Sequence, residues 1–188
     1  QGFAIAQAGI DAGAEVTLIT TTRDLPLPVG ATIVDVGSAE SMRDAVLEHI
    51  TDASVLVMSA AVAYYKPATQ SQQKIKKSDD DLSLSLARTP DILMDVKAYR
   101  EGHGYPRVTV GFAAESQNLL ENATGKLNRK GRNLLVANDI TASDAGFEVD
   151  TNRVIVLDDS GAQESLELMS KAHIGEYLMM RIGALLRD

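Results

Sequence analysis

Three lysines lie within four residues, at Lys74, Lys76 and Lys77, in a chain whose formal net charge is −8. Aspartates follow at 79–81. Clustered ammonium groups can neutralise the charge of a bound phosphate, which would suit a site for a phosphorylated ligand. A run of charge can equally be the solvated tip of a hairpin. Composition alone leaves both interpretations open.

A second pair of lysines, Lys126 and Lys130, is spaced four residues apart in a segment that we expect to be helical from Ser116 to about residue 130. Side chains at this spacing are neighbours on one face of a helix. They can lie over an apolar surface with their ammonium groups in water. They can also reach past the helix end toward a bound polyphosphate, and the spacing does not decide between the two.

The elements that would position these lysines alternate between strand and helix patterns. The run at 53–62 is nearly continuous apolar sequence, as in a strand buried on both faces of a parallel sheet. The alternation predicts an α/β fold with a Rossmann-like, doubly wound, mostly parallel sheet. The expected strands are 15–20, 31–36, 53–62, 107–115 and 133–140, with a closing pair at 153–158 and 165–169.

Capping residues mark several expected helices. Ser38 can accept a hydrogen bond at the start of one helix. Thr89 is the expected N-cap of another, with Pro90 as its first helical residue. The expected helices run from residue 1 to Gly13, from 38 to 50, from 89 onward, from 116 to 130 and from 170 to 186.

The segment 63–89 interrupts the alternation of strands and helices. Leucines and serines alternate at 82–86, which is typical of a strand with one solvated face. Together with the lysine-rich segment before it, this pattern predicts a β-hairpin flap on the edge of the sheet.

Ligands of open α/β sheets bind beyond the carboxyl ends of the strands. That rule points to 58–67, 111–116 and 137–139, where small residues would let a ligand approach the main chain. The same small residues would also allow helices to pack tightly on the sheet, and many such turns bind nothing.

Several classes of protein lack their sequence signals here. The chain has no cysteine, which excludes disulfides, thiolate metal sites and a cysteine nucleophile. Its sequence pI of about 4.9 argues against a nucleic-acid partner. No apolar run is long enough to span a membrane. The usual phosphate-loop, dinucleotide and hydrolase motifs are missing, and His49, His103 and His173 have no metal-ligand spacing. A cytoplasmic protein is expected.

Five segments in order resemble bacterial phosphopantothenoylcysteine synthetase: AAVAYYKP…KIKK, TPDIL, VGFAAES, KLNRKG and LLVANDI. The resemblance runs from Gln1 to the last helix and implies one domain over residues 1–188. It implies a ligase that activates 4′-phosphopantothenate with CTP and joins it to L-cysteine, with Mg²⁺ and as a homodimer. FMN would be involved only if a decarboxylase domain lies upstream.

The resemblance also implies roles for particular residues. Lys74 corresponds to the flap lysine that contacts the nucleotide and assists catalysis, whereas Lys76 and Lys77 remain on a solvated tip. Ala61 and Asn138 are expected at the acid substrate. The remaining expected nucleotide contacts are Met58, Ser59, Ala60, Tyr64, Pro90, Asp91, Ile92, Leu93, Phe112, Lys126 and Lys130.

The chain departs from the family pattern in two places. Tyr64 stands where the family has an aspartate of the nucleotide site, and a phenol brings no negative charge to hold a cation. The family's first strand, and a segment with an active-site asparagine, are expected to precede Gln1, and a polypeptide of residues 1–188 alone is expected to be inactive. The alternatives are a Rossmann-like nucleotide-binding module of another kind and a pseudoenzyme, the latter because of Tyr64.

Overall fold

The computed structural model describes residues 1–22, 24–69, 71, 73–74, 83–115, 127, 131–139 and 149–187. No helix within these residues is both long and apolar enough to cross a bilayer. The described elements are α1 (Gly2–Asp11), β1 (Thr17–Thr20), β2 (Thr32–Asp35), α2 (Ala39–His49), β3 (Val55–Met58), β4 (Tyr65–Pro67), β5 (Leu86–Arg88), α3 (Ile92–His103), β6 (Val108–Glu115), β7 (Leu134–Asp139), β8 (Thr151–Asp158), β9 (Gln163–Ser170) and α5 (Lys171–Leu185).

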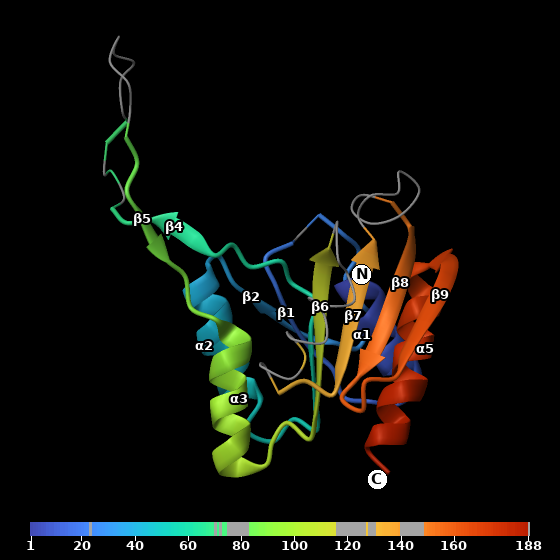
Figure 1. Cartoon of the computed structure of the whole chain (residues 1–188). Helices are drawn as coiled ribbons and strands as arrows, with labels where there is room; N and C mark the ends of the chain where they lie inside the picture. The colour runs from blue at the N-terminus through green and yellow to red at the C-terminus, as the bar shows by residue number, and fades with distance from the viewer. Residues whose placement is uncertain are drawn as a thin grey trace.

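The central sheet has five strands in the order β3-β6-β7-β8-β9. The first three are parallel, and β8 and β9 are antiparallel to their neighbours. Helices α1 and α5 cover one face, and α2 and α3 cover the other (Figure 1). The predicted α/β, doubly wound, mostly parallel fold is confirmed, including the closing strand pair.

Two apolar clusters hold these layers together. The α1/α5 cluster lies between those helices and the central sheet, and the α2/α3 cluster lies on the opposite side. Burial of these side chains from water supplies the main favourable term of folding. The α1/α5 cluster includes Ile5, Val110, Val136, Val154, Ile174 and Leu178, and the α2/α3 cluster includes Met42, Val46, Ile50, Met58, Leu93 and Val96.

Strands β1 and β2 form a parallel pair of their own. Ile19 of β1 and Leu56 of β3 both pack against the α2/α3 cluster. Within the described residues, however, no ladder of hydrogen bonds joins β1 to β3. Among the described residues, each of these two strands therefore has a partner along one edge, β2 for β1 and β6 for β3.

Strands β4 and β5 form an antiparallel hairpin that projects from the body of the molecule (Figure 1). Tyr65 pairs with Arg88, and Pro67 pairs with Leu86. This is the predicted flap, and we use the name flap for residues 63–89. Its segment 75–82 lies outside the described residues.

The helix caps agree with the sequence at α2 and differ at α3. Ser38 caps α2 by accepting a hydrogen bond from the main chain of Ser41 at 3.1 Å. The predicted Thr89 cap of α3 is wrong, because Asp91 accepts from Met94 N and the helix begins at Ile92. Thr89 instead bonds to the carbonyls of Ala63 and Tyr64, just before β4, so it is not available to cap the helix.

Candidate functional site at the carboxyl ends of the strands

Three parallel strands end at one edge of the central sheet. Met58 pairs with Gly111 across β3 and β6, and Ala114 pairs with Asn138 across β6 and β7. Residues 59–61 continue directly from β3, with Ala60 and Ala61 exposed. The structure therefore brings together the strand-end residues that the sequence selected.

The amino end of α1 approaches this edge closely. A β-carbon on Gly2 would lie 2.7 Å from Ser59 Oγ, so glycine is what allows the approach. Gln1 Nε2 donates to the carbonyl of Lys171 at 3.0 Å, which links the starts of α1 and α5. The first N–H groups of a helix carry partial positive charge. The edge thus gains an electropositive element that suits an anionic ligand.

Several predicted contact residues have buried or partly buried side chains. Met58, Ile92 and Leu93 belong to the α2/α3 cluster, and Phe112 packs against the α1/α5 cluster. A ligand at this edge would therefore meet the main chain of Met58, Ile92 and Leu93 rather than their side chains. Glycine at 111 leaves room for Arg132, whose side chain lies across that strand position.

Hydrogen bonds tie the predicted segment around Pro90 and Asp91 to the base of the flap. Thr89 N donates to the carbonyl of Tyr64 at 3.0 Å. Thr89 Oγ1 donates to the carbonyl of Ala63. Segments that are separated by the whole flap in the sequence therefore adjoin at the strand ends.

An ion pair fixes the flap to the body at a second point. Lys66 on β4 pairs with Glu40 in the first turn of α2. The hydrogen bond from Lys66 lowers the pKa of the Glu40 carboxyl. Both side chains are largely exposed, so the pair orients the flap more than it stabilises the fold.

The structure describes only some of the predicted lysine contacts and the unusual Tyr64. Lys74 lies in the flap and is exposed. Tyr64 is 76% exposed at the flap base. Lys126 and Lys130 lie outside the described residues. Within the described part of the chain, no group of three His, Asp or Glu side chains is arranged to hold a metal ion.

Asn152, which sequence analysis did not select, lies beside Asn138. Asn138 pairs with Val154, and Asn152 is two residues from Val154 on β8. Asn152 is 1% exposed. A polar residue on the inward face of a strand pattern is the signal that could have revealed it.

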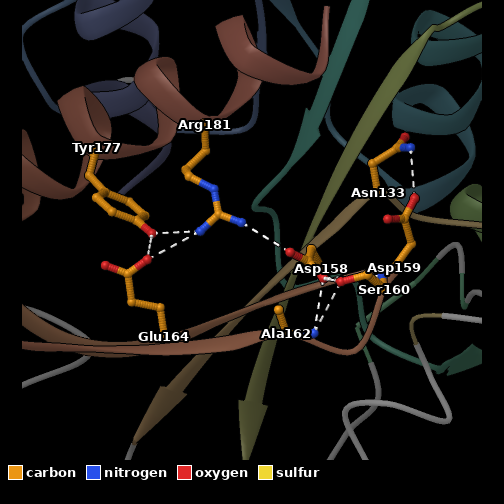
Figure 2. A network of polar contacts seen from close by, with 8 residues as sticks. All are labelled: Asn133, Asp158, Asp159, Ser160, Ala162, Glu164, Tyr177 and Arg181. Atoms are coloured by element: carbon orange, nitrogen blue, oxygen red, sulfur yellow. Dashed lines mark hydrogen bonds and ion pairs between the residues drawn. The ribbon is translucent and has the colours of Figure 1, made fainter. Parts of the chain in front are cut away.

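A polar network lies at the opposite edge of the sheet, where β7 begins and β8 ends (Figure 2). The Asp158 carboxylate accepts from Ser160 N at 3.1 Å, Ser160 Oγ at 2.5 Å and Ala162 N at 3.0 Å. Arg181 of α5 pairs with it at 3.2 Å. These interactions lower the pKa of Asp158, and the hydrogen bond from the Ser160 hydroxyl contributes most to this shift.

The same arginine extends the network along α5 (Figure 2). Arg181 donates to Tyr177 Oη at 2.8 Å and to Glu164 at 3.2 Å, and the tyrosine hydroxyl donates to Glu164. Burial raises the pKa of Tyr177. Every one of these groups has a partner within the network, which indicates a role in holding α5 to the β8–β9 hairpin.

The family described as DNA/pantothenate metabolism flavoprotein C-terminal domain matches residues 1–185. The chain is 37% identical to a coenzyme A biosynthesis bifunctional protein CoaBC of Vibrio vulnificus (strain YJ016), over 98% of this chain and 46% of the relative. It is 38% identical to CoaBC of Bacillus subtilis, over 98% of this chain and 45% of the relative. The chain spans about half the length of these relatives.

Solved structures of related domains also match this chain. The crystal structure of the C-terminal domain of CoaBC matches with a TM-score of 0.80 and 34% identity, over 100% of this chain and 84% of that chain. The DNA/pantothenate metabolism flavoprotein from Streptococcus pneumoniae matches with a TM-score of 0.79 and 25% identity, over 97% of this chain and 86% of that chain. A Cab2 mutant in complex with phosphopantothenate-cysteine shares the fold, with a TM-score of 0.62 and 17% identity, over 84% of this chain and 55% of that chain.

These matches agree with the resemblance drawn from the five ordered segments. The chain belongs to the family of the DNA/pantothenate metabolism flavoprotein C-terminal domain.

Proposed function

We propose that the chain joins 4′-phosphopantothenate to L-cysteine through an acyl-nucleotide, with CTP as the nucleotide. The observation that carries the proposal is the match along almost the whole chain to proteins named for coenzyme A biosynthesis. The fold shared with a structure that holds phosphopantothenate-cysteine is consistent with it. The electropositive edge at the strand ends is a suitable place for two phosphorylated substrates.

The reaction requires positioning and charge neutralisation more than proton transfer. The carboxylate of 4′-phosphopantothenate attacks the α-phosphate of CTP, and pyrophosphate leaves as the bond to the β-phosphate oxygen breaks. The amine of L-cysteine then attacks the acyl carbon, loses a proton, and CMP leaves. Fixed donors and cations aimed at the phosphates can supply the necessary stabilisation. In the proposal, Lys74, Lys126 and Lys130 neutralise the triphosphate, and Ala61 and Asn138 contact the acid.

The other parts of the proposal follow from the family resemblance. Mg²⁺ would accompany CTP, held largely by phosphate oxygens and water, as is common for this ion. Its charge would help to neutralise the triphosphate. A homodimer and a cytoplasmic location belong to the same proposal, and FMN belongs to it only where a decarboxylase domain lies upstream.

We also propose that residues 1–188 form a single domain whose sheet takes one further strand, between β1 and β3. Both strands contribute to the α2/α3 cluster, and each lacks a partner along one edge among the described residues. A strand inserted between two others separates them by roughly 9–10 Å. With it, β1, β3 and the strands beyond would form one continuous, mostly parallel sheet.

A pyrophosphate-release assay with 4′-phosphopantothenate, L-cysteine, Mg²⁺ and CTP tests the function, with the chain expressed together with the strand and segment that the family resemblance places before Gln1. We expect release that requires the acid, and a fall of roughly 10- to 100-fold in Lys74→Gln, because a cation at the transferred phosphate is lost. Arg187→Gln, which removes an exposed charge far from the strand ends, is the matched control. Unchanged turnover in Lys74→Gln would refute the role of that lysine.

Tyr64 allows the same assay to separate a ligase from a pseudoenzyme. If the tyrosine is a defect, Tyr64→Asp raises turnover, and if the site has adapted to it, turnover falls. No pyrophosphate release with CTP or ATP, even in Tyr64→Asp, would overturn the ligase proposal and favour the pseudoenzyme.

A further inference from the structure

Two asparagine side chains lie next to each other at the carboxyl edge of the sheet, on the face that α1 and α5 cover. Asn138 pairs with Val154, and Asn152 lies two residues farther along β8. The β8–β9 ladder is irregular between Asn152 and Val154, where three residue steps of β9 lie opposite two of β8. The extra residue belongs to β9, so the side chains of β8 still alternate between the two faces of the sheet. Asn138 and Asn152 therefore face the same side as Val154, and such diagonal neighbours have β-carbons roughly 7 Å apart.

The hydrogen bonds of Asn152 define which of its atoms is free. Its Oδ1 accepts from Arg153 N at 3.0 Å, which assigns the oxygen and leaves Nδ2 pointing elsewhere. That nitrogen is buried and has no hydrogen-bond partner within the described part of the chain. Buried polar atoms of folded proteins are nearly always paired, so an unpaired amide donor calls for an explanation.

Asn138 presents the complementary atom. Its Oδ1 is buried and, among the residues that the structure describes, accepts no hydrogen bond. The two asparagines thus offer one donor and one acceptor from the same face. The start of α1 is held nearby, because Gln1 bonds to Lys171 and Lys171 N bonds to Asp150, next to the start of β8.

A secondary amide is the ligand group that satisfies both atoms. Its carbonyl oxygen accepts one hydrogen bond and its N–H donates one, and in the trans form the two point in opposite directions. 4′-Phosphopantothenate carries one such amide, two methylene groups from the carboxylate that reacts. We propose that Asn152 Nδ2 donates to the carbonyl of this amide and that Asn138 Oδ1 accepts from its N–H.

This inference rests on the proposed function and names the residues that read the acid substrate. Holding the amide would fix the direction in which the carboxylate extends toward the nucleotide. It would also select against acids that lack an N–H at this place, because Asn138 Oδ1 would then stay unpaired. A bound water could pair with the same two atoms, and the experiment separates these occupants.

The test compares 4′-phosphopantothenate with its ester analogue, in which oxygen replaces the amide N–H, by calorimetric titration of the protein. The wild type should bind the ester roughly tenfold more weakly, as expected for a lost hydrogen bond to a buried acceptor. In Asn138→Leu, the two acids should bind alike. Asn138→Asp keeps an acceptor oxygen and should still prefer the amide.

The ratio of the two affinities is the deciding quantity, because a purely structural defect weakens both acids together. Asn152 is buried more deeply, so the test uses Asn138, and thermal unfolding checks that its variants are folded. A preference for the amide that persists in Asn138→Leu, or equal binding by the wild type, would overturn the inference and indicate that water occupies the place.

The outcomes also separate this inference from the ligase proposal. Equal binding of the two acids together with pyrophosphate release would overturn the amide contact and leave the ligase standing. A wild type that prefers the amide but releases no pyrophosphate would overturn the ligase and leave the amide contact standing. A wild type that binds neither acid would overturn both.

Discussion

The network around Asp158 and the pair Asn138 and Asn152 lie at opposite edges of the central sheet and differ in how their polar atoms are paired. At the amino edge, Asp158 accepts three hydrogen bonds from the following turn and pairs with Arg181 (Figure 2). At the carboxyl edge, Asn138 and Asn152 keep buried atoms without partners among the described residues. Fully paired networks add rigidity, whereas unpaired buried atoms cost stability unless something binds them. These bonds indicate a stabilising role for the Asp158 network, and the unpaired atoms of the two asparagines agree with the ligand that we propose at the carboxyl edge. Thr109 Oγ1, near the amino end of β6, is also buried without a partner among the described residues, so the contrast concerns these two groups rather than the whole edges.

The largest effect is expected from disrupting the hydrogen-bond network around Asp158 at the amino edge of the sheet. Asp158→Ala removes the acceptor of three hydrogen bonds and one partner of Arg181. We expect the free energy of unfolding to fall by about 3 kcal/mol, because several donors lose a charged acceptor at once. Urea unfolding measures this change. Substrate affinity of the folded variant should stay the same, and a large loss of affinity would contradict the division between the edges.

Low pH should reduce the stability of the protein through the same carboxylate, Asp158. The pKa of Asp158 is lower in the folded protein than its ordinary value of 3.8. Its contribution to stability is therefore complete above that ordinary value and is lost as the pH falls through the lowered pKa. The free energy of unfolding of Asp158→Ala should accordingly fall less steeply than that of the wild type as the pH drops below about 4. Equal slopes in both proteins would show that another group carries the acid sensitivity.

A smaller effect is expected at the carboxyl edge from Gly2→Ala. The new β-carbon would lie 2.7 Å from Ser59 Oγ, so Ser59 or the start of α1 must move. We expect turnover in the ligase assay to fall about tenfold, since small displacements of positioning groups are costly. Gly183→Ala is the control, because nothing lies within 4 Å of its added β-carbon. Unchanged turnover in Gly2→Ala would mean that this contact lies outside the site.

The smallest effect concerns the flap anchor. Glu40→Gln removes the ion pair with Lys66, which is exposed. Stability should change by less than about 1 kcal/mol. The Michaelis constant for CTP should rise a few-fold, because the flap that carries Lys74 is less well oriented. Combining Glu40→Lys with Lys66→Glu should restore it, and a double variant no better than the single one would exclude an orienting role.

The sequence predicted the layers and the strand ends because these depend on local patterns. Continuous apolar runs identified β3 and β7, and turn residues separated β8 from β9. The N-cap of α3 was misplaced because Thr89 bonds across the flap to Ala63 and Tyr64, a contact that spans more than twenty residues. Asn152 was missed because the expected strand began at residue 153, whereas β8 begins at Thr151 and buries Asn152.

Hydrogen exchange with and without 4′-phosphopantothenate and CTP tests the central claim that ligands bind at the carboxyl edge. The predicted result is slower exchange at residues 59–61 and 137–139 when both substrates are present, with no change at residues 158–164. Protection confined to residues 158–164, or no protection at the strand ends at saturating substrate, would contradict the account.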